Sequence, residues 1–491
     1  MKKYVLAIDQ GTTSTRCILF DKEANIIHQS QKEVECIFPN DGWVEQNALD
    51  VYISVLDVIN DCLTRTNLTP ENIDCIGLTN QRETTVVWDK QTGMPVYNAV
   101  VWQSRQSLDI CQKYARYEDL IHKKTGLIIN PYFSASKIRF ILDHIENGQK
   151  RAENGELMFG TIDTWIMYKL SNGAIFKTDV SNASRTMLFN INELKWDDEL
   201  LKLFNIPKCM MAEVVPSSSL FGYASKFKDD LKICGVAGDQ QAALFGQNCF
   251  EIGDSKNTYG TGCFLLMNVG NKPVFSNNGL LTTIAWQYEG KITYALEGSV
   301  FIGGASIQWL RDQMKMISKA SDSEKYAKSV EDDLGVYVVP AFVGLGAPYW
   351  DNQCRGAVFG LTRGTTKEHF VRATLNSIAL QSKDLVVAME KESKKKLNVL
   401  KVDGGATAND YLMQYQANIL NSNVMLPYIL ETTALGAAYL AGLENKYWKD
   451  IEEIKSIHRY RKEYNPEFSK EQINNIDEKW KKAIEATKVF K

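Results

Sequence analysis

The segment AIDQGTTSTRCILF, residues 7–20, combines two apolar runs with a turn of glycine and hydroxyl side chains. Short runs of β-branched and other apolar residues predict buried strands, and the Gly/Thr turn between them predicts a hairpin. The segment NTYGTGCFLLM, residues 257–267, repeats this order of strand, turn and strand. Two such hairpins far apart in the chain suggest two similar halves that meet at one site. We place the boundary near Gly246, which divides the chain into domains 1–246 and 247–491.

Several apolar runs end in glycine or aspartate before a turn, and they cover residues 4–9, 76–79, 233–238 and 400–405. In α/β proteins such runs are buried strands, and ligands bind just beyond their carboxyl ends. Helical spacing follows the last run, where Leu412, Tyr415 and Ile419 recur behind a predicted cap at Asn409. An amphipathic pattern over residues 469–490 predicts a docking helix. The sequence therefore predicts an α/β fold.

The composition argues against several classes of protein. A formal net charge of −3 over 491 residues provides no electrostatic attraction to nucleic acid or to an anionic membrane, so we expect neither as a partner. The ten cysteines form no CxxC pair, which favours reduced thiols that fill the core. The five histidines show no metal-binding spacing, which argues against a histidine-built metal site. The apolar run at residues 5–8 is too short for a signal peptide or a span, so we expect a cytoplasmic protein without membrane insertion.

The turn of the first hairpin is suited to phosphate. Gly11 allows backbone N–H groups to approach an anion, and hydroxyl and guanidinium groups add further donors at Thr12, Thr13, Ser14 and Arg16. Asp9, at the end of the first strand, suits Mg²⁺, which is usually held by one or two carboxylates, waters and phosphates. An ordinary hairpin turn is the alternative.

The second turn, at residues 260–262, offers the same kinds of donor. The sequence contains no P-loop pattern GxxxxGK[ST], no GxGxxG fingerprint and no HRD/DFG set. A nucleotide site built on these two turns is therefore of a different type.

Asp239 follows the apolar run 233–237 through Gly238 and precedes a predicted helix. Aspartate is a common helix N-cap, which is one interpretation. The other is a carboxylate at a strand tip that accepts a hydroxyl proton as an alcohol attacks the γ-phosphoryl group. Phosphoryl transfer demands little of such a base, because positioning and charge neutralisation lower most of the barrier. The residues alone leave both interpretations open.

The motif NQRETT, residues 80–85, follows another predicted strand and contains Arg82 and Glu83. A forked guanidinium beside a two-oxygen acceptor suits the adjacent hydroxyl groups of a polyol. A surface salt bridge is the alternative. Aromatic side chains either wall such a site or belong to the core, namely Trp102, Tyr132 and Phe264.

From residue 8 to about residue 442 the chain resembles the FGGY carbohydrate kinases. The shared motifs are DQGTTS (9–14), NQRETT (80–85), GDQQAALFG (238–246), NTYGTGCF (257–264), GLGAPYWD (344–351), RGAVFGLTR (355–363) and VDGGA (402–406). NQRETT and NTYGTG are the most specific of these, and they resemble the members that phosphorylate glycerol.

The resemblance implies two actin-like (ribonuclease H-like) ATPase domains around a central cleft. It implies Mg²⁺-dependent transfer of the ATP γ-phosphate to glycerol, giving sn-glycerol 3-phosphate and ADP, the first step of glycerol catabolism. Asp239 would be the base, and Asp9 and Asp239 would hold Mg²⁺. Glycerol would be bound by Arg82, Glu83, Trp102, Tyr132, Asp239, Gln240 and Phe264. ATP would be bound by Thr12, Thr13, Ser14, Arg16, Thr261, Gly304, Gln308, Gly405 and Asn409, of which Gly304 and Gln308 are suggested by the resemblance alone.

One departure from the family concerns regulation. Residues 221–233 lack the glycine-rich loop through which some bacterial members bind fructose 1,6-bisphosphate, and they lack the histidine that is phosphorylated in others. We expect neither control here, and we expect a homodimer or homotetramer. The alternatives for function are a kinase of another small polyol or ketose, of the xylulose or ribulose type, and an actin-like ATPase that uses nucleotide to change shape. The Arg82–Glu83 pair argues against the second.

Overall fold

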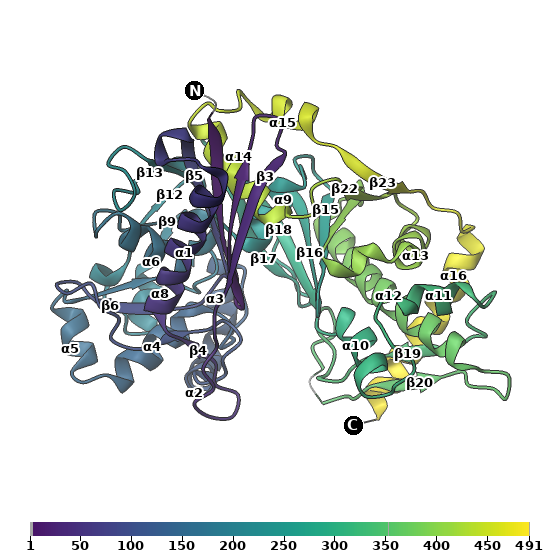
Figure 1. Cartoon of the computed structure of the whole chain (residues 1–491). Helices are drawn as coiled ribbons and strands as arrows, with labels where there is room; N and C mark the ends of the chain where they lie inside the picture. The colour runs from purple at the N-terminus through teal and green to yellow at the C-terminus, as the bar shows by residue number, and fades with distance from the viewer. Residues whose placement is uncertain (1–2, 352, 491) are drawn as a thin grey trace.

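The computed structural model describes residues 3–351 and 353–490 and has an α/β fold with two lobes, each built around one large sheet (Figure 1). The first sheet has the strand order β13-β14-β5-β1-β2-β3, with the bounds Tyr4–Gln10 (β1), Ser14–Phe20 (β2), Ile26–Glu33 (β3), Ile73–Asn80 (β5), Ser218–Tyr223 (β13) and Lys232–Gly238 (β14). The second has the order β17-β18-β16-β15-β21-β22-β23, with the bounds Asp254–Tyr259 (β15), Cys263–Gly270 (β16), Leu281–Tyr288 (β17), Lys291–Val300 (β18), Val399–Asp403 (β21), Val424–Pro427 (β22) and Tyr460–Tyr464 (β23).

The two sheets share one topology. In the first, β1, β2 and β3 are antiparallel neighbours, and β5 and β14 extend the sheet parallel to β1. In the second, β15, β16 and β18 are antiparallel neighbours, and β21 and β22 extend the sheet parallel to β15. This repetition confirms the prediction of two similar halves and gives the actin-like (ribonuclease H-like) architecture. The four apolar runs are strands β1, β5, β14 and β21, and the two predicted hairpins are β1–β2 and β15–β16.

Helices cover both faces of each sheet. Helix α1 (Ala48–Thr66) packs on the outer face of the first sheet. Helix α14 (Thr432–Glu444) comes late in the chain, yet it packs on the inner face of the first sheet, and with α9 (Asp239–Gly246) it lies between the two sheets (Figure 1). The outer face of the second sheet is covered by α12 (Lys367–Ser393) and α13 (Asp410–Leu420). Helix α16 (Lys470–Val489) packs against α12, where Trp480 Nε1 donates to Asp384 Oδ2 at 2.7 Å.

The crossing of α9 and α14 depends on glycine. A Cβ atom on Gly436 would lie 1.8 Å from the carbonyl oxygen of Ala242, and one on Gly246 would lie 2.0 Å from that of Thr432. Helix backbones can approach this closely only where no side chain intervenes. Because α9 begins at Asp239, this crossing also fixes the position of that residue between the lobes.

Local predictions for the second half are confirmed. The side chain of Asn409 caps α13 by accepting a hydrogen bond from Leu412 N at 3.0 Å. The periodic residues of α13 and α16 are buried, except for the half-buried Ile476: Leu412, Tyr415, Ile419, Ile473, Trp480 and Ile484. Eight of the ten cysteines are buried, but Cys209 is exposed, so a core position is wrong for that residue. Within residues 3–351 and 353–490, no helix has the length and apolar character needed to span a membrane.

Candidate active site

Neighbouring strands of the first sheet end at one edge. In register, Asp9 of β1 lies beside Thr79 of β5, and Thr79 lies beside Ala237 of β14. The chain leaves β5 into residues 80–85 and leaves β14 into α9. The polar residues that follow these strands are therefore brought together, as expected for the carboxyl ends of parallel strands.

Arg82 is the centre of a buried ionic cluster. Its Nη1 and Nη2 atoms donate to the two carboxylate oxygens of Glu297, at 2.6 and 2.9 Å. Nη1 also donates to Gln241 Oε1 at 3.2 Å, and Nε lies 3.2 Å from Asp239 Oδ1. A longer hydrogen bond of 3.4 Å joins Nη2 to the hydroxyl of Tyr132. Partners from both lobes therefore fix the orientation of the Arg82 guanidinium.

Glu83 is buried beside Arg82 and has a strained backbone. The two side chains are 1% and 2% exposed, so the alternative of a surface salt bridge is wrong. Glu83 has a φ of 59°, a left-handed conformation that is costly for a residue with a Cβ atom. The hydroxyls of Thr85 and Ser134 both donate to its carbonyl oxygen at 3.1 Å, and its carboxylate accepts from Arg185 Nε at 2.6 Å. These contacts hold the carboxylate in a fixed orientation, which suits a ligand-binding group.

Arg185 and Glu297 complete the ionic cluster. Arg185 Nη2 donates to Glu297 Oε1 at 3.2 Å, and its guanidinium lies 5.7 and 5.3 Å from the ring centres of Tyr132 and Phe133. Burial by itself raises the pKa of Glu297, but the charges of Arg185 and Arg82 hold that pKa at about 2. Glu297 therefore keeps its charge at neutral pH, whereas burial raises the pKa of Glu83 in spite of Arg185 and Arg82.

Trp102 and Tyr132 form an aromatic wall beside the cluster. Their rings meet edge to face with centres 5.4 Å apart, and both side chains are partly exposed rather than buried in the core. Trp102 Nε1 donates to Thr12 Oγ1 at 2.8 Å, which joins this wall to the turn of the first hairpin. Phe264 comes from the second sheet, where it is partly exposed opposite Thr258.

Asp239 is the first residue of α9, and Gly238 is the N-cap. The interpretation of Asp239 as the N-cap is therefore wrong, although its Oδ1 accepts a hydrogen bond from Gln240 N at 2.7 Å. A side chain at Gly238 is excluded, because a Cβ atom there would lie 2.7 Å from Cγ of Arg82. The side chain of Asp239 is 31% exposed, so it remains accessible beside the buried cluster. A helix N-terminus also favours a negative charge at this position.

The turn at residues 260–262 packs against the start of α10 (Gly304–Asp312). The first residue of α10 donates its N–H to Gly260 O at 2.9 Å, and a Cβ atom on that residue would lie 2.6 Å from the same oxygen. Close contact between turn and helix therefore requires glycine there. The predicted nucleotide residues of this region are brought together: Thr261, Gly304 and Gln308.

A cavity of about 630 Å³ opens between the lobes, large enough for a small ligand. Its lining includes Asp9 and Arg16 of the first hairpin, the loop 403–405 and the start of α14. Arg16 Nη1 donates to Glu431 Oε2 at 2.8 Å within this lining. Two predicted nucleotide residues line the cavity, Arg16 and Gly405, while Asn409, the cap of α13, stands between the lining residues Ala408 and Asp410.

Asp9 is the candidate metal ligand. Burial raises its pKa to about 7, Arg16 opposes this shift, and the charge of Asp239 adds to it. A partly buried carboxylate near a second carboxylate suits a divalent cation, and Mg²⁺ takes only one or two carboxylates when phosphates and waters supply the rest. Within the described part of the chain, no three His, Cys, Asp or Glu residues are grouped to hold a metal by themselves. The residues therefore fit Mg²⁺ held jointly with phosphate.

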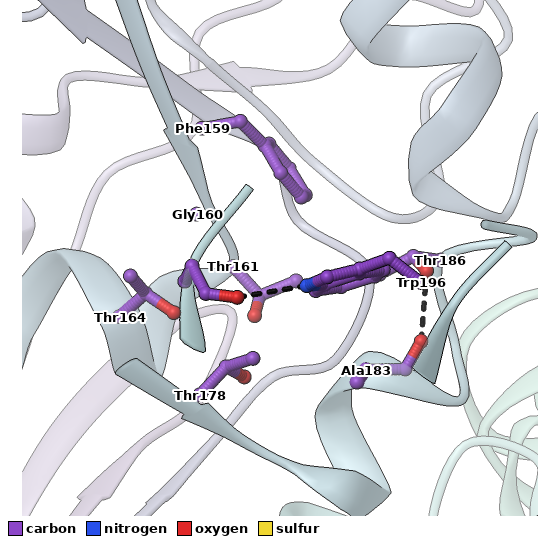
Figure 2. A pocket seen from close by; sticks show the side chains of 9 residues that line it. Phe159, Gly160, Thr161, Thr164, Thr178, Ala183, Thr186 and Trp196 are labelled. Atoms are coloured by element: carbon purple, nitrogen blue, oxygen red, sulfur yellow. Dashed lines mark hydrogen bonds between the residues drawn. The ribbon is translucent and has the colours of Figure 1, made fainter. Parts of the chain in front are cut away.

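A smaller void lies inside the first lobe, beside β8 (Leu157–Gly160) (Figure 2). Trp196 Nε1 donates to Ala212 O at 2.7 Å, and the hydroxyl of Thr186 donates to Ala183 O at 2.8 Å. The lining residues are uncharged: Phe159, Gly160, Thr161, Thr164, Thr178, Ala183, Thr186, Trp196 and Ala212. Because no charged group reaches it, we interpret this void as a packing gap rather than a ligand site.

Three residues of the site were not predicted from the sequence: Arg185, Glu297 and Lys256. Arg185 lies in the segment SNASRT, which has no distinguishing pattern. Glu297 and Lys256 are buried charges within β18 and β15, and Lys256 Nζ donates to Gln240 Oε1. A charge inside an otherwise buried strand is the signal that could have found these two, because a buried charge requires a partner.

Comparison with known proteins agrees with this geometry. Residues 4–246 match the N-terminal domain of the FGGY family of carbohydrate kinases, and residues 255–444 match its C-terminal domain. The chain is 57% identical over 496 aligned residues to the glycerol kinase of Bacillus cytotoxicus and 56% identical to that of a Geobacillus species. Both alignments cover 100% of each chain.

Solved structures show the same architecture. The glycerol kinase of Plasmodium falciparum, solved with ADP, superposes with a TM-score of 0.94 at 35% identity, covering 99% of this chain and 98% of that chain. A xylulose kinase of Lactobacillus acidophilus superposes with a TM-score of 0.88 at 21% identity, covering 99% and 97%, a likeness that concerns the fold alone. With both halves matched in order and the site assembled between them, the chain belongs to the FGGY family of carbohydrate kinases.

Proposed function

We propose that this chain is a glycerol kinase. It transfers the γ-phosphate of ATP to glycerol and releases sn-glycerol 3-phosphate and ADP, the first step of glycerol catabolism. The observation that carries this proposal is the 57% identity over the full length to the glycerol kinase of Bacillus cytotoxicus.

The buried cluster around Arg82 supports a small polyol as the substrate. A carboxylate and a guanidinium fixed side by side match adjacent hydroxyl groups, which both donate and accept. The hydrogen bond from Arg82 Nη2 to Tyr132 is long at 3.4 Å, so a substrate hydroxyl can replace it. We assign glycerol binding to Arg82, Glu83, Tyr132, Asp239 and Gln240, with the carbon chain against Trp102 and Phe264.

Asp239 is proposed as the general base, because its partly exposed carboxylate stands beside the cluster. It accepts the proton of one substrate hydroxyl while the oxygen of that hydroxyl bonds to the γ-phosphorus. The bond from this phosphorus to the oxygen that bridges to the β-phosphate breaks, and ADP leaves with that oxygen. Nearby cations and fixed donors lower the barrier more than the base does.

The two glycine-rich turns are proposed to hold ATP. The first turn and its strand supply Thr12, Thr13, Ser14 and Arg16, and the second lobe supplies Thr261, Gly304, Gln308, Gly405 and Asn409. Backbone N–H groups and hydroxyls at such turns bind phosphate oxygens. Asp9, with Asp239, would hold Mg²⁺, which when bound neutralises charge on the phosphates.

We further propose a division into domains 1–246 and 247–491 and assembly as a homodimer or homotetramer. The two sheets are drawn from opposite sides of residue 246, which supports the division. Helix α14 packs against the first sheet, so the second domain closes over part of the first. Light scattering on the purified protein tests the assembly, and a monomer at all concentrations would contradict it.

A substrate panel tests the activity. Purified protein with ATP and Mg²⁺ is assayed against glycerol, xylulose and gluconate, and the highest kcat/KM is expected for glycerol. A higher kcat/KM for either of the other two would overturn the substrate assignment. ATP hydrolysis that is independent of glycerol and leaves no phosphorylated product would favour an actin-like switch protein.

A further inference from the structure

Lys256, in β15 of the second sheet, is a fully buried lysine without a task in the proposed reaction. It is 0% exposed, and its Nζ donates to Gln240 Oε1 and, at 2.9 Å, to Thr258 Oγ1. A buried ammonium is costly unless it is hydrogen-bonded, so these acceptors hold it in place. Gln240, in contrast, is partly exposed at the start of α9, next to Asp239.

The contact with Lys256 decides which way the amide of Gln240 faces. An ammonium group only donates, so the amide must present its oxygen to it. The amide NH₂ group then faces away from Lys256, and within residues 3–351 and 353–490 no acceptor takes its protons. The oxygen of a ligand hydroxyl is an acceptor that matches this donor.

Lys256 reaches Gln240 from the opposite lobe. In register, Lys256 pairs with Leu266 of β16, and Leu266 pairs with Glu297 of β18. Cross-strand partners point to the same face, so Lys256 and Glu297 project together from the second sheet. Glu297 holds Arg82, and Lys256 holds Gln240. Through these two contacts, the second sheet therefore orients two of the proposed glycerol-binding side chains, Arg82 and Gln240.

Two carboxylates partly offset the cost of burying an ammonium group at Lys256. Burial lowers the pKa of Lys256, and the carboxylates of Asp403 and Asp239 act in the opposite direction. Asp403, the last residue of β21, accepts a hydrogen bond from Gln247 Nε2 at 2.9 Å, which fixes its carboxylate in place. The charged form of Lys256 is a donor without acceptor capacity, as the orientation of Gln240 requires.

We propose that Lys256 is a positioning residue, which fixes the amide of Gln240 so that this side chain donates to one hydroxyl of the substrate. This inference rests on the proposed function, because the hydroxyl belongs to a small polyol of the glycerol class. Lys256 thereby favours polyols that have this hydroxyl, and it contributes little to the binding of ATP.

The test compares Lys256→Met with Lys401→Met. Lys401 of β21 is a matched control, because it pairs in register with Lys256, is 5% exposed, and donates to Asn248 O at 2.7 Å instead of to Gln240. Lys256→Met is expected to raise the KM for glycerol about tenfold to a hundredfold and to leave the KM for ATP within about twofold. Lys401→Met is expected to leave both KM values within about twofold.

Two further variants keep the test valid if Lys256→Met does not fold. Lys256→Gln retains an N–H donor for Gln240 Oε1, so most of the lost affinity for glycerol should return. Gln240→Glu retains an acceptor for Lys256 but removes the donor to the substrate, so the KM for glycerol should rise as in Lys256→Met. One of the two diols, 1,2-propanediol or 1,3-propanediol, lacks the contacted hydroxyl. The KM for that diol should be the same in Lys256→Met and in the wild type.

Three outcomes would overturn the proposal. An unchanged KM for glycerol with a lower kcat would assign Lys256 to the transferred phosphoryl group. Equal increases in the KM for glycerol in Lys256→Met and Lys401→Met would mean that Lys256 contributes only to packing. The same conclusion would follow if Lys256→Met raised the KM for both diols as much as it raises the KM for glycerol. A wild-type protein that does not phosphorylate glycerol would instead refute the proposed function, and that result is obtained before any variant is made.

Discussion

The two sides of the candidate active site differ in how completely their charged side chains are paired within the protein. On the proposed glycerol side, the side chains of Arg82, Glu83, Glu297 and Arg185 are 0–2% exposed and are paired with one another. On the proposed nucleotide side, Arg16 and Glu431 are 34% and 28% exposed, and they line an open cavity of about 630 Å³. The glycerol side is preorganised, whereas the nucleotide side requires a ligand to complete it.

This difference has a physical reason. A small polyol offers few contacts, so the groups that bind it must be oriented before it arrives. A nucleotide carries several charges and many acceptors, so flexible exposed donors and backbone N–H groups suffice. The buried cluster is also strongly coupled, because removing one partner leaves another buried charge unpaired. The exposed pair should contribute little to stability.

Loss of the proposed base should have the largest effect. Asp239→Asn is expected to lower kcat by about 10²–10⁴, because the group that accepts the hydroxyl proton is removed. ATP should still bind, as titration of the purified variant with nucleotide would measure. Asp198→Asn, at an exposed aspartate paired with Lys208, is the control and should keep its turnover. A turnover near that of the wild type in Asp239→Asn would mean that another group is the base.

Breaking the buried cluster should have the next largest effect. Glu297→Gln is expected to lower the free energy of unfolding by about 3–5 kcal/mol, since Arg82 and Arg185 lose their shared counter-charge. Denaturant unfolding measures this change. Glu485→Gln, at an exposed pair with Lys488, is the control and should change stability by less than about 0.5 kcal/mol.

The same variant makes a prediction about pH. The pKa of Glu297 is lowered from 4.5 to about 2, so its stabilising charge is complete above pH 4.5 and is lost only as the pH falls towards 2. The stability difference between the wild type and Glu297→Gln should therefore be equal at pH 6 and pH 8. A difference that changes strongly between these two values would contradict a Glu297 that stays charged throughout this range.

Removal of Arg16 should affect ATP without affecting the fold. Arg16→Ala is expected to raise the KM for ATP roughly tenfold, because a charged donor to phosphate is lost. Its stability should stay within about 0.5 kcal/mol of the wild type, because the pair with Glu431 is exposed. Steady-state kinetics and thermal unfolding measure the two quantities. A large loss of stability would show that the two sides of the site do not differ as described.

Removal of the Glu431 charge, the partner of Arg16, should have the smallest effect, and it should lower the KM for ATP rather than raise it. Glu431 accepts from Arg16 at 2.8 Å, so it competes with phosphate for the guanidinium. Glu431→Gln is expected to lower the KM for ATP about two- to threefold, in keeping with the modest strength of an exposed pair. A higher KM for ATP would mean that Glu431 holds Arg16 in its binding position.

Most of the fold was predictable because its signals are local. Apolar runs that end in glycine or aspartate predicted β1, β5, β14 and β21, and the two Gly/Thr turns predicted the repeated halves. The same local chemistry predicted the cap at Asn409. Local patterns failed for the helix cap at Asp239, because cap and first helical residue differ by a single position and a glycine at 238 also satisfies the pattern.

The sequence by itself determined the strands, the phosphate turns and the resemblance to a family of kinases, because each depends on residues close together in the chain. Only the tertiary structure decided that the Arg82–Glu83 pair is buried and which charged residues are its partners. Its counter-charge Glu297 lies 215 positions away from Arg82, and Arg185 lies 102 positions from Glu83. Such partners are chosen by tertiary packing, within the first lobe for Arg185 and between the lobes for Glu297, because a buried charge must find its complement. Lys256 and the orientation of Gln240 belong to the same class, since they depend on a contact between lobes that no local pattern contains.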